Sequence, residues 1–407
     1  MGGGAAGLAT AIFAARAGAS SRVLLLDGAG SLGAKILVSG GSRCNVTNAR
    51  VEAADFWRAG SPFVRQVLRA LPVPETVAFF EEIGVTLQEE PRGKLFPTTN
   101  KARTVLDALL SEATRLNVDI RTSSRVRGLR RHGAHWILET SAGPIRASRV
   151  VLATGGLSLP KTGSDGLGYA LARAHGHTIV PPVPALEPLL LGGDFHASLS
   201  GIAHDGAIRI ARPGHKQIEL RGPLLWTHFG ISGPLALDAS RFMRRAQVEG
   251  SRAEMSLSFT PLLSEEGVDR RLIAATRERP QNPVATEVGR AFGLPQALAL
   301  RLVGSTMGRE GTLAKLTRDG RRRLVRALTS FPLEVVGGRG FNFAEVTSGG
   351  VPLEEVNPKT MESRLAPGLY FVGEILDVDG RIGGFNFQWA WATGKVAGAA
   401  IARAGAW

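Results

Sequence analysis

The sequence contains very little of the chemistry that binds metals or cross-links a fold. Cys44 is the single cysteine among 407 residues, which excludes a disulfide framework and a thiolate-based metal cluster. The eight histidines show no HExxH or similar ligand spacing. The sequence therefore predicts no metal site.

Long apolar runs are also missing. No stretch reaches the length of a membrane span. The apolar stretch 8–19 is similar to the core of a signal peptide, but it contains Arg16 and no basic segment precedes it. We expect a cytoplasmic protein with no membrane partner, and the sequence does not indicate an oligomeric state.

Acidic residues are in deficit. There are 35 of them against 49 lysines and arginines, which gives a net charge of +14. Such a balance favours an anionic partner, and RNA is the obvious candidate. Basic side chains that are simply solvated would explain the same charge.

The first residues carry a dinucleotide-binding signature. Gly2, Gly4 and Gly7, with Ala6 between them, form GxGxxG at the start of an Ala-rich helix. Asp27 follows twenty residues later, at the end of an apolar strand, where a carboxylate would hold ribose hydroxyls. The strand that should precede Gly2 is absent, and we expect the start to be clipped or misassigned.

A second Gly-rich loop is expected over 33–48. Gly40 and Gly41 expose backbone N–H groups, and Arg43, Asn45 and Thr47 add further polar groups. Such a nest is suited to the same pyrophosphate.

Two later segments favour FAD over NAD. The apolar strand before Ala153, Thr154 and Gly155 is typical of flavoproteins near the adenosine end of the cofactor. A second strand leads to Gly373 and Glu374, which we expect on the ribityl chain, and the last helix opens with glycines that aim N–H groups at the flavin. The residues expected to bind cofactor in this last part are Gly373, Glu374, Asp379, Gly383, Gly384, Phe385 and Asn386.

The pattern of elements predicts an interrupted α/β domain. Residues 1–184 and 335–407 read as two parts of one FAD-binding domain, and 181–184 read as a stiff proline linker. Between them, 185–262 is dominated by β-like runs and 263–334 by helical periodicity, including a helix over 312–329.

Four motifs resemble one known family. The stretches GGGAAGLATA, AKILVSGGSRCNVTN, THFGISGPLAL and GLYFVGEILDVDGRIGGFNFQWAWATG are similar to the YhiN/BaiN-type, aminoacetone-oxidase-like flavoproteins. The resemblance covers the whole chain. It implies a Rossmann-like, two-dinucleotide-binding-type fold with a β-barrel-like and a helical insertion, and a flavin that reduces a conjugated C=C bond in a steroid-like enone or in a uracil of ribosomal RNA. Ser42 replaces a usual glycine, and Phe385 and Phe387 replace an expected Tyr and Leu.

Three side chains are candidates for catalysis. Reduction of an enone needs a proton donor and groups that hold enolate charge. Cys44 offers an acid, or else a small side chain packed beside the cofactor. His228 lies in a Gly-rich motif of the insertion, and Lys35 lies where it reaches either the flavin or the substrate carbonyl, or pairs with a carboxylate.

A basic helix in the insertion has no expected flavin role. Spacings of three and four place several of its charges on one side, where phosphate contacts or simple solvation are the alternatives. The residues are Lys315, Arg318, Arg321, Arg322, Arg323 and Arg326. A predicted basic turn over 125–131 slightly favours RNA as well.

We therefore predict an FAD-dependent oxidoreductase that takes electrons from NAD(P)H and reduces a conjugated C=C bond, with a uracil in structured RNA as one substrate. A small-molecule enone reductase or amine oxidase is the first alternative. A flavin-containing RNA-binding or redox-sensing protein without turnover is the second. No second clear GxGxxG separates NADH from NADPH.

Overall fold

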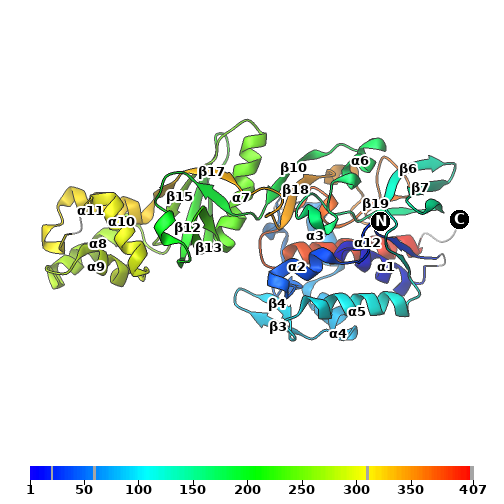
Figure 1. Ribbon diagram of the computed structural model, residues 1–407, viewed down its shortest axis with the longest axis horizontal. Coiled ribbons are helices and arrows are strands. Elements are labelled where there is room, and N and C mark those ends of the chain that lie inside the picture. The colour runs from blue at the N-terminus through cyan, green and yellow to red at the C-terminus, as the bar shows by residue number, and fades with distance from the viewer. Residues whose placement is uncertain (20–21, 58–60, 309–310, 404–407) are drawn as a thin grey trace. The chain divides into compact units, whose positions relative to one another are not determined.

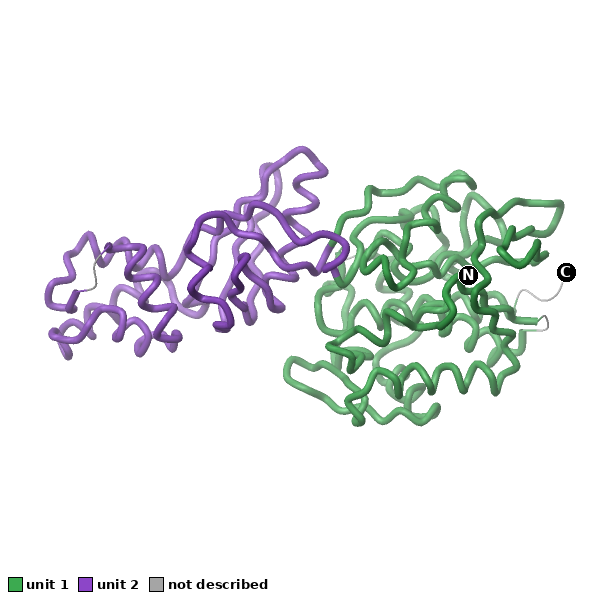
Figure 2. The backbone as a smooth tube through the Cα atoms, viewed as in Figure 1, with its two compact units in different colours: residues 1–184, 345–407 green, residues 185–344 purple. Residues whose placement is uncertain are grey.

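The computed structural model describes residues 1–19, 22–57, 61–308 and 311–403. The chain divides into two compact units, residues 1–184 with 345–407, and residues 185–344 (Figure 2). The first boundary lies at the position predicted from the sequence. The chain returns to unit 1 at Glu345 rather than at 335, because the strand Val335–Gly338 pairs within the sheet of unit 2.

Unit 1 mixes helices and short strands (Figure 1). Its helices are α1 (Ala5–Arg16), α2 (Ala34–Ser42), α3 (Pro62–Ala70), α4 (Val73–Glu82), α5 (Ala102–Arg115), α6 (Leu167–Ala174) and α12 (Phe385–Arg403). Its strands are β1 (Leu24–Leu26), β2 (Thr47–Asn48), β3 (Leu87–Glu90), β4 (Lys94–Pro97), β5 (Asp119–Arg121), β6 (Val126–His132), β7 (His135–Thr140), β8 (Gly143–Ala147), β9 (Val150–Leu152), β10 (Val180–Ala185), β18 (Val346–Gly350) and β19 (Leu369–Phe371).

Two parallel strand pairs frame the first two residues. β1 pairs with β5, and β9 pairs with β19. The Met1 nitrogen donates to Val151 O at 2.9 Å, Ala153 N donates to Met1 O at 2.9 Å, and Gly2 N donates to Leu26 O at 2.8 Å. Met1 and Gly2 therefore take the central place that the first strand of a Rossmann sheet occupies.

Helix α1 packs closely against α12, and small residues allow this. A Cβ atom added to Gly394 would lie 2.8 Å from Ala9 Cβ, and one added to Gly398 would lie 2.7 Å from Ala14 N. Residues on both helices are buried in the main core of unit 1. This packing fixes the start of α1, where the GxGxxG motif lies.

Three expectations for unit 1 were wrong. The predicted second Gly-rich loop begins as helix α2. The predicted basic turn over 125–131 is mostly strand β6, in which exposed arginines alternate with the buried Val126 and Leu129. The expected proline linker is strand β10, which pairs with β18, an arrangement that proline permits at a sheet edge.

Unit 2 contains one seven-stranded sheet in the order β16-β15-β12-β13-β14-β11-β17, and its neighbouring strands are antiparallel. This sheet takes the place of the expected barrel-like region. Its strands are β11 (Leu189–Leu191), β12 (Ala203–Ala211), β13 (Ile218–Thr227), β14 (Gly230–Ser232), β15 (Glu254–Ser258), β16 (Phe331–Leu333) and β17 (Val335–Gly338). Helix α7 (Gly233–Val248), which the sequence reading missed among the β-like runs, packs on β13.

Between β15 and β16 the chain forms a helical part. Its helices are α8 (Glu265–Glu278), α9 (Val284–Phe292), α10 (Gln296–Met307) and α11 (Arg318–Thr329). Helix α11 begins after Thr317, whose side chain accepts a hydrogen bond from Gly320 N, so it starts later than the predicted 312. Leu324, Val325 and Leu328 anchor its apolar side.

Candidate cofactor and substrate sites

The three glycines of the first motif have different surroundings. A Cβ atom on Gly2 would lie 2.3 Å from Ala153 O, and one on Gly7 would lie 1.8 Å from Gly2 O. Nothing lies within 4 Å of a Cβ atom built on Gly4, the N-cap of α1. Gly2 and Gly7 are thus required for packing, whereas Gly4 faces open space at a helix N-terminus, which suits a pyrophosphate.

Asp27 lies beside this helix start. Its Oδ2 accepts a hydrogen bond from Gly3 N at 2.6 Å, and its Oδ1 accepts one from Ala29 N at 2.7 Å. These bonds fix the carboxylate after β1, where the sequence predicts the ribose contact.

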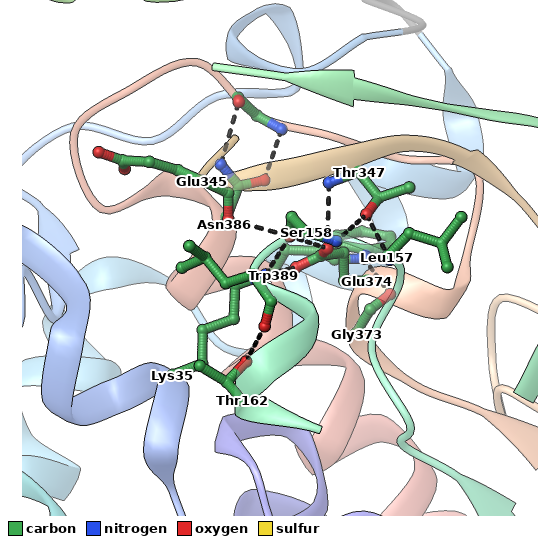
Figure 3. A network of polar contacts seen from close by, with 12 residues as sticks. Lys35, Leu157, Ser158, Thr162, Glu345, Thr347, Gly373, Glu374, Asn386 and Trp389 are labelled. Atoms are coloured by element: carbon green, nitrogen blue, oxygen red, sulfur yellow. Dashed lines mark hydrogen bonds and ion pairs between the residues drawn. The ribbon is translucent and has the colours of Figure 1, made fainter. Parts of the chain in front are cut away.

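Glu374 forms the centre of a polar network (Figure 3). Lys35 Nζ lies 2.6 Å from Glu374 Oε2 and donates to Ser158 Oγ at 2.6 Å. Ser158 Oγ donates to Glu374 Oε1 at 2.9 Å, and Thr347 N donates to the same oxygen at 3.0 Å. One carboxylate thus ties together α2, the loop after β9, β18 and the segment after β19.

Glu374 has several protein partners in this network. Both of its carboxylate oxygens accept protein donors, and its contact with the ribityl chain stays a prediction. Lys35 pairs with a carboxylate, one of the alternatives weighed for it. The sequence reading missed Ser158 and Thr347 because their role depends on a contact between strands that are far apart in the chain.

The last residues of α2 turn through left-handed backbone. Gly40, Gly41 and Ser42 have φ values of 56°, 68° and 65°. The turn leads to Asn45, a buried residue whose Oδ1 has no hydrogen-bond partner among the described residues. An unpaired buried acceptor costs about 1–3 kcal/mol, which a donor on a bound cofactor would offset.

Two predicted ligands in this segment have other partners. Arg43 forms an ion pair with Glu90 at 2.6 Å, and its guanidinium stacks 4.1 Å from the centre of the Phe96 ring. The buried Thr47 donates its hydroxyl hydrogen bond to Gln388 Oε1 at 2.7 Å. Both contacts argue against direct roles at the pyrophosphate.

The loop before α12 is held against β2. A Cβ atom on Gly384 would lie 2.4 Å from Thr47 O, and Asn48 Nδ2 donates to Gly383 O at 3.1 Å. Asn386 closes the loop by bonding both the N–H and the C=O of Gly380. Asp379 and Phe385 are buried here, so the side chains of this loop support its backbone.

The remaining predicted segments meet α1. Gly373 packs so closely that its Cβ atom would lie 2.7 Å from Ala6 Cβ, and its N–H donates to Thr393 Oγ1 at 3.0 Å. Gly155 has a φ of 70°, and the buried Thr154 Oγ1 has no partner among the residues that the structure describes. The predicted flavin segments therefore converge in unit 1, and the open space at Gly4 and the unpaired Asn45 fit a bound FAD.

Cys44 lies within this region but is completely buried. Burial raises the pKa of its thiol to about 12. A thiol in that position is neither exposed nor acidic, which favours the packing role over the catalytic one.

Comparison with known proteins decides the family. The model of the HI0933-like protein Rossmann domain matches residues 1–400. The chain belongs to the HI0933-like family. It is an enzyme of the FAD-dependent oxidoreductase class.

Two curated relatives of this HI0933-like chain differ in name. It is 35% identical over 404 residues to the 3-dehydro-bile acid delta(4,6)-reductase of Clostridium scindens, covering 99% of this chain and 98% of the relative. It is 31% identical over 393 residues to the ribosomal RNA dihydrouridine synthase of Escherichia coli, covering 97% and 94%.

The other predicted residues of this HI0933-like protein lie in unit 2. His228 is exposed in the turn between β13 and β14, and its ring meets the Phe229 ring at 5.0 Å between centroids. On α11, Arg321 is committed to Asp269 at 2.7 Å and leaves the predicted set. For the rest of the set, the described residues provide no ion-pair partner, and all are exposed: Lys315, Arg318, Arg322, Arg323 and Arg326.

Among the described residues, no group of histidine, cysteine or acidic side chains could hold a metal ion, and no helix has the length and apolar character to cross a membrane.

Proposed function

We propose that this enzyme is an NAD(P)H-linked reductase of a carbon–carbon double bond conjugated to a carbonyl group. The convergence of the predicted flavin segments in unit 1 carries the proposal. The names of the relatives support it, since a delta(4,6)-reductase and a dihydrouridine synthase both add two hydrogens to an unsaturated ring.

The residues that would hold the cofactor all lie in unit 1. Gly4 and the start of α1 would face the pyrophosphate, Asp27 the ribose, and Asn45 with the backbone of Gly383 and Gly384 the flavin ring. When bound, FAD supplies hydride transfer. Overall, one substrate carbon gains a hydride and its neighbour a proton, while NAD(P)H is oxidised to NAD(P)⁺.

Lys35 has a positioning role in this proposal. It neutralises Glu374, which holds the loop after β9 and strand β18 beside the cofactor segments. Cys44 is not the proton donor in this proposal, because it is buried and its pKa is raised.

Anaerobic photometry tests the proposal. The purified protein is expected to carry FAD, to oxidise NADPH or NADH, and to be reoxidised by a conjugated enone. A protein that carries FAD but is reoxidised only by oxygen would contradict it. Reduction by an amine would favour the oxidase alternative, and no reaction with any donor would favour the non-catalytic one.

A second, narrower candidate concerns the substrate. The net charge of +14 and the unpaired basic residues of α11 favour a uracil in structured RNA. Arg318, Arg322 and Arg326 follow one another at i, i+4 and i+8, so they share a helix face and can neutralise neighbouring phosphates.

Salt-dependent binding to a transcribed ribosomal RNA fragment tests this candidate. Replacing Arg318, Arg322 and Arg326 by Glu should lower the slope of log K against log salt by about 2–3. The matched control reverses three exposed arginines of unit 1 that lie outside the basic stretch 125–131, Arg69, Arg146 and Arg173.

Each triple reversal changes the charge by −6, from +14 to +8. Equal losses in the two variants would mean that only net charge matters. Detection of dihydrouridine by mass spectrometry would then separate an RNA substrate from a small enone.

A further inference from the structure

A second recognition feature lies in unit 2, where two turns of the sheet approach each other. Strand β11 pairs with β14 on one side and with β17 on the other, and Leu189 lies opposite both Ile231 and Gly338. The shared strand brings the His228–Phe229 turn close to Arg339, which follows β17.

Arg339 is held by aromatic rings rather than by a carboxylate. Its guanidinium carbon lies 3.5 Å from the centre of the Phe343 ring and 4.7 Å from that of Phe229. No carboxylate pairs with its side chain among the residues that the structure describes. Stacking occupies the faces of a guanidinium and leaves its N–H edge available to an oxygen acceptor.

The backbone on either side of Arg339 is held by the buried side chain of Glu187. Gly340 N donates to Glu187 Oε2, and a Cβ atom on Gly338 would lie 2.4 Å from Glu187 Oε1. The Glu187 side chain is fully buried and pairs with Arg244 at 2.6 Å. Both neighbours of Arg339 therefore rest on one buried ion pair, so the loop is preorganised.

Other arginines of unit 2 pair with carboxylates. Arg209 and Arg221 both pair with Glu219, and Arg301 pairs with Asp194. Arg339 shares its ring partner Phe229 with the exposed His228. The surface formed by His228, Phe229, Arg339 and Phe343, which we call the Arg339 cluster, thus combines two donors with two flat apolar rings.

We propose that the Arg339 cluster binds an oxyanion of the substrate, with Arg339 as the specificity-determining residue and His228 as a second donor. The inference rests on the proposed reductase function and adds that its substrate carries a phosphate or carboxylate beside a planar or flat ring system. The two rings provide apolar surface, and the guanidinium edge matches the geometry of either anion.

Calorimetric titration of the FAD-loaded enzyme tests the cluster with two pairs of probes. Uridine 5′-monophosphate is compared with uridine, and a 3-oxo-Δ4 bile acid with its methyl ester. The wild type should bind the anionic member of one pair more tightly, and that pair identifies the source of the anion.

Arg339→Gln should weaken binding of that anionic probe by about 10- to 100-fold, as expected for a lost charge-assisted hydrogen bond, and leave its neutral partner unchanged. Arg339→Lys should restore only part of the loss, because an ammonium keeps the charge without the stacked fork. Phe343→Leu should have an intermediate effect by releasing the guanidinium. Arg221→Gln, an exposed arginine of the same sheet, is the matched control.

Equal losses for anionic and neutral probes, an equal loss in Arg221→Gln, or no preference of the wild type for either anion would overturn the proposal. NADPH-dependent enone reduction is measured on the same samples. Reduction that persists without anion preference would reject the cluster alone, whereas anion preference without any reduction would reject the reductase function.

Discussion

The basic residues that the sequence analysis singles out have different partners in the two units. In unit 1, two basic residues of the predicted cofactor segments are neutralised, Lys35 by Glu374 and Arg43 by Glu90. In unit 2, Arg339 stacks on rings, and the exposed basic residues of α11 have no ion-pair partner within the described part of the chain. This contrast supports the two proposals made above, that glycine backbone and buried polar groups of unit 1 hold the cofactor and that basic residues of unit 2 bind an anionic group of the substrate.

The largest expected effect tests the backbone half of this comparison. Gly4→Val should yield a folded protein without flavin, because its side chain enters open space where the pyrophosphate is expected. Absorbance of the purified protein and circular dichroism measure the two properties separately.

Gly7→Ala is the matched variant, since its Cβ would lie 1.8 Å from Gly2 O. It should destabilise the fold itself by several kcal/mol, of order 3. A yellow Gly4→Val protein would sink the assignment of this loop to the cofactor.

The charge pairing of unit 1 is tested next. A double-mutant cycle with Lys35→Met and Glu374→Gln should give a coupling energy of about 1–2 kcal/mol in urea unfolding, because both side chains are largely buried and share Ser158.

The exposed pair Arg50–Glu52 provides the control, for which a clearly smaller coupling energy is expected because water screens it. Equal coupling in the two pairs would remove the distinction between a site network and an ordinary surface ion pair.

A smaller effect concerns the buried thiol of unit 1. Cys44→Ala should cost about 1 kcal/mol and leave flavin binding and enone reduction intact. The thiol of the native wild-type protein should not react with a thiol reagent at pH 8, whereas one thiol per chain should react in the unfolded protein.

The buried thiol makes the free energy of unfolding depend on pH. Burial raises its pKa to about 12 in the folded protein against a usual value of 9.0. Its contribution to the stability of the fold is therefore complete below pH 9 and is lost as the pH rises from 9 toward 12. Cys44→Ala should lack this part of the alkaline loss. If the thiol were catalytic, Cys44→Ala would instead abolish turnover.

The smallest expected effect is at Ser42, where the family resemblance implies a glycine. Its φ of 65° lies in the left-handed region, where a side chain costs about 1 kcal/mol. Ser42→Gly should therefore stabilise the protein by about 0.5 kcal/mol after the greater freedom of unfolded glycine is subtracted. Ser39→Gly, at a φ of −68°, should destabilise it.

Much of the cofactor side could be predicted because short sequence motifs specify backbone. Glycines at fixed spacing, an acidic residue after a strand, and a Gly-Gly helix start each carry a local conformational requirement. The segments 1–7, 40–48, 153–155 and 373–386 meet as that reasoning expects. The errors occurred where tertiary pairing overrode local preference, as in β10, whose prolines read as a linker, and β6, whose arginines read as a turn.

The sequence by itself determined the family, the flavin motifs and the excess of positive charge, because these depend on residue type and on spacing along the chain. Only the tertiary structure decided which basic residues pair with a carboxylate and which stay without one. Glu374 meets Lys35 across 339 positions, Arg321 meets Asp269 across 52, and Arg339 meets Phe229 through strands on either side of β11. Pairing between side chains depends on distance in space, and the fold alone sets that distance.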